Sequence, residues 1–120
     1  MSSPVEPTLV ALAAPLLAGG LHPNVAPPQV ATPYGVYQVV VSLTHNTLSD
    51  GVPIAHDLIQ IGVWEGTYAG ALAAGSALAA ALQAAFDLGT LTGVQRSRQG
   101  RYDPETALHG FLYEYSFWSA

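Results

Sequence analysis

The sequence predicts an α+β domain: a mostly antiparallel sheet of four to five strands with two main helices packed on it, in the order α-β-β-α-β-β. Two observations lead to this prediction. An apolar segment near the N-terminus begins with the capping residues of a helix, and residues 67–86 have their larger apolar side chains at helical spacing. Residues 34–43, 55–64, 94–102 and 107–118 have the composition of strands and are separated in pairs by turn residues. The length of 120 residues suits a single domain, which we assign to residues 1–120.

The first helix is predicted to begin near the N-terminus of the chain. Ser3, Pro4 and Glu6 have the spacing of an N-cap residue, a first-turn proline and a capping-box acid. Pro15 cannot occupy a helix interior without the loss of a backbone hydrogen bond. We therefore expect the helix to kink or restart at Pro15 and to end at Gly19-Gly20.

A proline-rich connector, HPNVAPPQVATP, occupies residues 22–33. Each proline pushes the residue before it into extended or polyproline geometry, which predicts a semi-rigid strap. Such a strap would fix the first helix relative to the sheet and present a stiff edge, including Pro27 and Pro28, to a partner. The alternative is a proline-rich loop that only crosses the surface of the domain.

The predicted strands 34–43 and 55–64 flank a hairpin-turn signal, Ser49-Asp50-Gly51. If pairing continues to the turn, one arm is about 50 Å long at roughly 3.3 Å per residue. A compact domain of this length is only about 35 Å across. Either the hairpin tip projects from the domain or residues 44–53 form a disordered loop. The candidate contact residues of a projecting tip are His45, Asn46, Leu48 and Asp50.

The helix predicted over residues 67–86 has two different faces. Its larger side chains, which form a stripe at helical spacing, are Tyr68, Leu72, Leu78, Leu82 and Phe86. The opposite face is uncharged and consists of Ala69, Ala73, Ser76, Ala77, Ala80 and Ala84. Because small side chains let another backbone approach closely, we take Ala69, Ala73, Ala77 and Ala80 as candidate subunit contacts. The alternative is a bland, exposed alanine-rich face.

Residues 66–86 contain no charged side chain and are long enough to span a bilayer. Their content is mostly Ala, Gly, Ser and Gln, and acidic Glu65 and Asp87 flank them without a basic residue. We therefore expect a helix buried in protein, with a membrane span as the minor alternative.

The last two predicted strands differ in polarity. Residues 107–118 are apolar on both faces, which predicts a central strand, whereas residues 94–102 are polar. The polar strand contains all the positive side chains of the chain, Arg96, Arg98 and Arg101, and strand alternation places the first two on one face. These arginines either pair with carboxylates of their own domain, such as Glu105 or Glu114, or contact acidic groups of a neighbouring subunit.

The composition favours an assembled protein and disfavours several chemistries. Charged residues make up 9% and hydrophobic residues 50% of the chain, which suggests that other subunits cover part of its surface. The net charge of −5 and the absence of lysine disfavour binding to nucleic-acid phosphates. The absence of cysteine excludes disulfides and thiolate metal sites.

No catalytic, metal-binding or cofactor-binding motif stands out. Without lysine there is no Schiff base and no phosphate-loop lysine, and there is no G-x-S-x-G elbow. The four histidines, at positions 22, 45, 56 and 109, lie in different predicted elements and lack the spacing of a metal-binding pair. We therefore predict that the protein is not an enzyme and holds no cofactor.

An ordered set of motifs resembles a known family. His22-Pro23-x-Val25-Ala26-Pro27 and Thr32-Pro33-Tyr34-x-Val36-Tyr37-Gln38 are followed by a strand ending in Trp64, an alanine-rich helix and the stretch YDPETALHGFLYEYSFW. Together they resemble the tail completion, or tail terminator, proteins of long-tailed bacteriophages, from about Leu9 to Trp118. The chain departs from the family at two positions, where members often have an aromatic residue in place of His22 and a basic residue in place of Gly110.

The resemblance implies a structural role in the virion. Proteins of this family form a ring, typically a hexamer, at the head-proximal end of the tail tube, where they stop its polymerisation and join the tail to the neck or head. The implied partners are further copies of the chain, the tail tube protein and a neck or connector protein, and assembly takes place in the host cytoplasm. DNA would pass through the lumen without specific binding, and no membrane is involved.

Two alternatives remain at this stage. A neck or head-completion subunit of related fold would show every feature that the residues alone predict for this chain. A small oligomeric enzyme or ligand-binding domain could use His56, His109 and nearby carboxylates, and a deep polar pocket uniting the two histidines would favour it.

Overall fold

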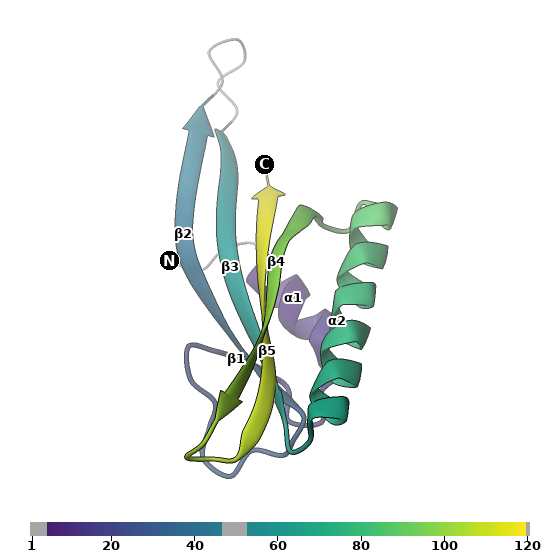
Figure 1. Ribbon diagram of the computed structural model, residues 1–120. Coiled ribbons are helices and arrows are strands. Elements are labelled where there is room, and N and C mark those ends of the chain that lie inside the picture. The colour runs from purple at the N-terminus through teal and green to yellow at the C-terminus, as the bar shows by residue number, and fades with distance from the viewer. Residues whose placement is uncertain (1–4, 47–52, 120) are drawn as a thin grey trace.

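A five-stranded mixed sheet forms the centre of the protein (Figure 1). The computed structural model describes residues 5–46 and 53–119. The strands follow the order β1-β2-β3-β5-β4, where β1 is Leu21–Pro23, β2 is Tyr34–Asn46, β3 is Pro53–Glu65, β4 is Thr92–Asp103 and β5 is Leu108–Ser119. The predicted α+β class is confirmed. The central position of β5 is confirmed as well, because it pairs with β3 on one side and β4 on the other.

The predicted order of elements lacks β1, which makes the sheet mixed. This strand runs parallel to β2, with Leu21 opposite Gly35 and Pro23 opposite Tyr37. It is anchored at both ends by backbone hydrogen bonds, from Gly35 to the Gly20 carbonyl (2.9 Å) and from Asn24 to the Tyr37 carbonyl (2.8 Å). A strand of three residues that ends in proline is too short to produce a detectable pattern.

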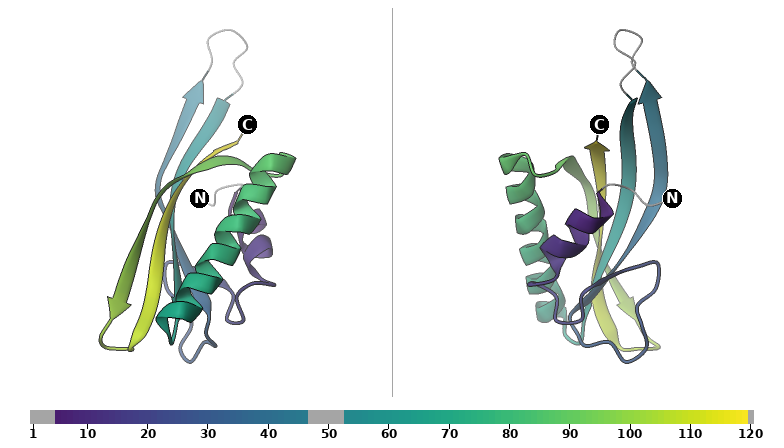
Figure 2. Two further views of the ribbon diagram at one scale, coloured as in Figure 1. Left: turned by 45° about the vertical axis from the view of Figure 1, so that its right-hand side comes forward. Right: turned by 180° about the vertical axis from the view of Figure 1, so that it is seen from behind.

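Two helices, α1 (Glu6–Ala13) and α2 (Tyr68–Leu88), cover the same face of the sheet (Figures 1 and 2). Because strand residues alternate between faces, every second residue of β3 and β5 lies under these helices. The fully buried core includes Leu9, Leu17, Ile59, Ile61, Val63, Leu78, Leu82, Tyr113, Tyr115 and Phe117. The opposite face, which we call the open face, has no helix on it in the described residues.

Helix α1 is shorter than predicted. It ends at Ala13 and does not restart after Pro15; turns continue to Gly20. Proline has no N–H to donate, and the following amides instead bond back to the Ala13 carbonyl, at 2.9 Å from Leu16 and 3.0 Å from Leu17. The predicted capping residues Ser3 and Pro4 lie outside the described residues.

The connector between α1 and the sheet is not one continuous extended segment. Asn24 and Gln29 have left-handed backbone angles, with φ of 65° and 60°, so the strap turns twice. The Thr32–Pro33 peptide bond is cis. Neither Asn24 nor Gln29 precedes a proline, so the extended geometry expected before each proline does not apply to these two positions.

The β2–β3 hairpin is longer than the predicted strands and extends beyond β5 (Figure 1). Pairing continues to Asn46 opposite Pro53, whereas the last β5 partner of β3 is Ser119, opposite Ala55. The projecting arm is thus confirmed as far as the structure describes it. Leu48, Asp50 and the predicted turn lie outside the described residues, as do the side chains of His45 and Asn46.

Candidate interaction surfaces

Helix α2 begins and ends at well-defined caps. The side chain of Thr67 accepts a hydrogen bond from the Gly70 amide at 3.0 Å, which satisfies one of the free amides of the first turn. Gly89 ends the helix in the left-handed conformation, with φ of 79°. Between the caps, α2 packs on the sheet through Ala71, Ala74, Gly75, Leu78, Leu82 and Ala85.

The outer face of α2 lies on the opposite side of the helix and is exposed. It consists of the predicted residues Ala69, Ala73, Ser76, Ala77, Ala80 and Ala84. None of them carries a charge, and because their side chains are small the helix backbone on this face is accessible. The prediction of a packing stripe was wrong at one residue: Tyr68 is 59% exposed, although its ring lies near those of Phe111 and His109 of β5, at 5.6 and 6.3 Å between ring centroids.

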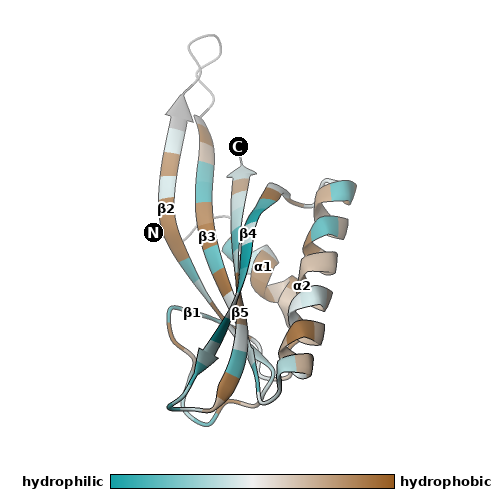
Figure 3. Ribbon diagram, in the orientation of Figure 1, coloured by the Kyte–Doolittle hydropathy of each residue, from teal (hydrophilic) through white to brown (hydrophobic). Residues whose placement is uncertain are grey.

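A second uncharged surface, which the sequence did not predict, lies on the open face of the sheet. We call it the distal patch, because it lies toward the hairpin end, and it consists of Val41, Leu43, Ile54, Leu58, Val94 and Trp118. Four of these side chains are well exposed: Val41 (42%), Leu43 (48%), Ile54 (36%) and Val94 (47%). The alternation of apolar residues along β2 and β3 is visible in Figure 3.

The register of the sheet brings the distal patch together from four strands. Val41 is opposite Leu58, and Ser116 links Leu58 to Val94 across β5. In the next row, Leu43 is opposite His56, which is opposite Trp118. The His56 and Trp118 rings stack at 4.7 Å with an interplanar angle of 2°. The patch is therefore a continuous surface rather than a set of scattered residues.

A row of polar side chains separates the distal patch from the other end of the open face. This row consists of Gln38, Gln60, Glu114 and Ser97, which are neighbours across the four strands. Glu114 accepts a hydrogen bond from the Ser97 hydroxyl at 3.0 Å. The polar row defines one edge of the patch.

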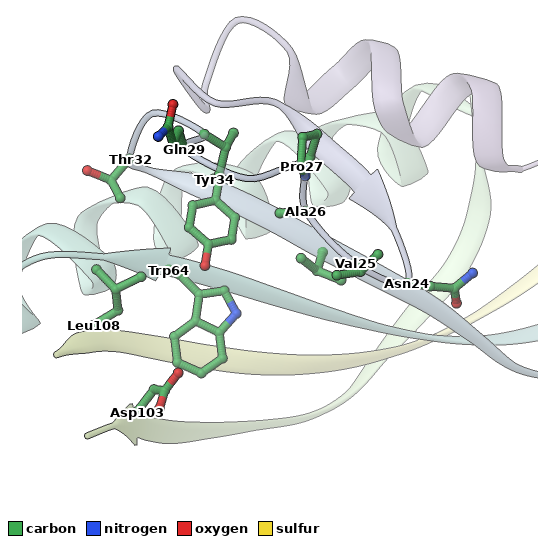
Figure 4. A pocket seen from close by; sticks show the side chains of 12 residues that line it. Asn24, Val25, Ala26, Pro27, Gln29, Thr32, Tyr34, Trp64, Asp103 and Leu108 are labelled. Carbon is green, nitrogen blue, oxygen red and sulfur yellow. The ribbon is translucent and has the colours of Figure 1, made fainter. Parts of the chain in front are cut away.

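Beyond the polar row, the strap and the strands enclose an open hollow of about 490 Å³ (Figure 4). Tyr34, Trp64 and Asp103 lie along it, with Pro27 of the strap on its rim. Burial, together with the charge of Asp103, raises the pKa of the Tyr34 hydroxyl. The candidate residue Pro27 thus lines a concave surface, while Pro28 is exposed beside it.

The indole of Trp64 explains one departure from the family pattern. A Cβ at Gly110 would lie 2.5 Å from the Trp64 ring, so no larger residue fits there without movement of the ring. The other departure has a local role, because a ring nitrogen of His22 lies 2.6 Å from the Gly19 carbonyl oxygen.

The three arginines of β4, for which pairing within the domain and contact with a neighbouring subunit were both considered, are exposed. None forms an ion pair with a carboxylate in the part of the chain that the structure describes. A bulge between Gln95 and Ser97 lies at Arg96 and interrupts the pairing of β4 with β5 there. The Arg98 guanidinium instead lies 5.7 Å from the centre of the Phe111 ring.

Residues 8–120 match the family model of the tail completion protein gp17. The chain belongs to the tail completion protein family. Its resemblance to this family is therefore confirmed over nearly its whole length, and its role is that of a structural protein of a bacteriophage tail that acts together with other tail or head proteins. No curated protein matches the chain at a significant level.

In this tail completion protein, the histidines do not form a common site. His56 of β3 is opposite Trp118 of β5, and His109 of β5 is opposite Glu65 of β3. The two histidines are therefore nine residues apart along these strands, a distance of about 30 Å. No group of three or more metal-ligating side chains occurs within the described residues. The polar pocket that would have favoured an enzyme, one that unites the two histidines, is therefore not formed by these elements.

Helix α2 of the tail completion protein is long and apolar enough to cross a membrane by length and composition. Here it packs along one side on the aromatic core of the sheet, with Leu78 and Leu82 fully buried. A core helix of a globular protein passes the same test of length and hydropathy.

Proposed function

We propose that this tail completion protein forms a ring of identical subunits at the head-proximal end of the tail tube, where it stops tube polymerisation and joins the tail to the neck or head. The observation that supports the proposal best is the pair of uncharged exposed surfaces, the outer face of α2 and the distal patch, on opposite sides of one small domain. A single copy leaves both surfaces in water. Contiguous exposed apolar surface usually marks a site of association.

The proposed mechanism is steric. One end of the ring binds the last ring of tube subunits through a surface that resembles their own contact surface. The other end lacks the surface that a further tube ring needs and offers a different one to the neck. Around the ring, each subunit contacts its neighbours through two different surfaces, which is the arrangement that closes head-to-tail assemblies. In the hexamer typical of the family, six such contacts would close the ring.

The test is the length of tails in lysates of phage that lack this protein, measured by electron microscopy. Overlong tubes without heads would support the proposed stop of polymerisation. Tails of normal length that fail to join heads would contradict termination and assign the protein to the neck. Normal infectious particles would refute both roles. Expression of the intact protein from a plasmid is the control, because it should restore the normal length and the joining of heads.

A further inference from the structure

We propose that the distal patch on the open face of the sheet binds the outer face of α2 of a neighbouring copy of this chain. The inference rests on the proposed ring and names the two surfaces that build it. It starts from the distal patch, because a surface with Val41, Leu43, Ile54 and Val94 between 36% and 48% exposed is costly to leave in water.

Charge favours a second copy as the occupant. Neither the distal patch nor the outer face of α2 contains an Asp, Glu, Lys or Arg residue. His56, which lies between Leu43 and Trp118 in the patch, is stacked on the Trp118 ring. A partner that approached the patch with charged side chains would have to bury them without a counter-charge, at a high cost in desolvation. The chain itself provides an uncharged surface of suitable length, since the residues from Ala69 to Ala84 extend for about 24 Å along the helix at 1.5 Å per residue.

Shape favours the same occupant. Within the subunit, α2 packs its small residues against large side chains of the sheet, and at Gly75 the helix backbone approaches the Tyr113 ring closely. The proposed contact repeats this mode on the other side of the helix, with alanines of α2 against the branched and aromatic side chains of the patch. Helix α2 would then lie between two sheets, one from its own subunit and one from the neighbour.

The positions of the two surfaces make the contact heterologous. The outer face of α2 points away from the sheet, and the distal patch lies on the sheet face that α2 does not cover (Figure 2). One copy cannot bring its own two surfaces together. Each copy would instead give its helix to one neighbour and receive a helix from the other, so that a closed ring leaves neither surface exposed.

Two substitutions, Ala77→Arg on the helix and Leu43→Arg on the patch, test the contact. Both residues are exposed in the subunit, so both variants should keep the fold, which circular dichroism and thermal melting can verify. The matched control is Ala11→Arg, on the exposed side of α1. The oligomeric state of purified protein is measured by native mass spectrometry and by size exclusion with light scattering.

We expect the unmodified protein and the Ala11→Arg control to form closed oligomers, and each of the other two variants to be monomeric. An equal mixture of the two variants should form a dimer and nothing larger, because the intact helix of Leu43→Arg can bind the intact patch of Ala77→Arg. An unmodified protein that stays monomeric at millimolar concentration would overturn the inference. So would a variant that still assembles alone, or a mixture that does not dimerise.

These outcomes are independent of the test of function. Oligomers built through these two surfaces, together with normal tails in lysates that lack the protein, would leave the contact standing and refute the terminator. Overlong tails together with a failed mixing experiment would support the terminator and refute this contact.

Discussion

Replacement of Gly75 by alanine should destabilise the protein through one contact with Tyr113. Gly75 lies in the middle of α2 and is buried against the sheet. A Cβ at this position would lie 2.4 Å from the Tyr113 hydroxyl oxygen and 3.1 Å from the nearest ring carbon. The Tyr113 ring lies next to Tyr115, with 6.4 Å between centroids, so it has little room to move aside.

Two opposing effects set the magnitude. Alanine is better than glycine in a helix interior by about 1 kcal/mol. Overpacking of a dense core typically costs about 1–3 kcal/mol. The contact at 2.4 Å belongs to the upper part of that range, because a rigid phenol is the obstacle. We therefore expect Gly75→Ala to lower the free energy of unfolding by roughly 1–2 kcal/mol.

The Tyr113→Phe background isolates the cause. It removes the hydroxyl that the new methyl group would meet. That hydroxyl makes no hydrogen bond of normal geometry within the described residues, although the Arg98 guanidinium acts on it electrostatically. The remaining contacts, at 3.1 and 3.2 Å, can be relieved by small shifts. Gly75→Ala should then be close to neutral, and the double-mutant cycle should give a coupling energy of roughly 1–2 kcal/mol.

The assay is urea denaturation followed by circular dichroism, at one fixed protein concentration because assembly would add to the apparent stability. The control is Gly66→Ala, since a Cβ at Gly66 meets no atom within 4 Å. Equal destabilisation by Gly75→Ala with Tyr113 and with phenylalanine at that position would refute the steric reasoning.

Three further predictions follow from single interactions. Thr67→Ala should lower the free energy of unfolding by about 1 kcal/mol, because it removes the N-cap of α2; an unchanged urea midpoint would contradict this. Ser116→Ala should raise the free energy of unfolding by about 1 kcal/mol, because the buried Ser116 hydroxyl has no hydrogen-bond partner in the described structure. A lower urea midpoint would show that the hydroxyl has a hydrogen-bond partner in solution. Burial raises the pKa of Tyr37 and of Tyr115 from 10 to about 12, so above pH 10 the unfolded chain loses protons that the folded chain keeps. Stability should be complete below pH 10 and should fall as the pH approaches 12, and a urea midpoint that does not change across this range would count against the burial of these hydroxyls.

The predictable parts of the fold are those with strong local patterns. The helix predicted over residues 67–86 is found as α2, which begins after Thr67 and ends at Leu88. The apolar side chains on both faces of β5 correctly predict its central position in the sheet. In each case, the pattern lies within one continuous segment, so neighbouring residues alone carry the information.

The parts that were missed depend on contacts between distant segments. The distal patch arises because the bulge at Val40 shifts the alternation of β2, which places Val41 and Leu43 on the open face. The run of valines at 39–41 has no period from which such a bulge could be predicted. The same reason applies to Arg96, whose bulge is set by pairing with β5, about 20 residues away.

The exposed arginines of β4 fit the proposal that this protein ends an assembly. β4 is an edge strand, and an edge strand has free backbone groups that can recruit a further strand. Charged side chains and bulges are common devices against such pairing, and β4 has Arg96, Arg98 and Arg101 together with a bulge at Arg96. The opposite edge differs, since β1 pairs with β2 only from Gly35 to Tyr37, and the rest of β2 toward the hairpin has no neighbouring strand on that side among the described residues. If the ring forms through the outer face of α2 and the distal patch as proposed, β4 remains as an edge that discourages further strand pairing. The edge of the β2–β3 hairpin then remains free for a specific partner.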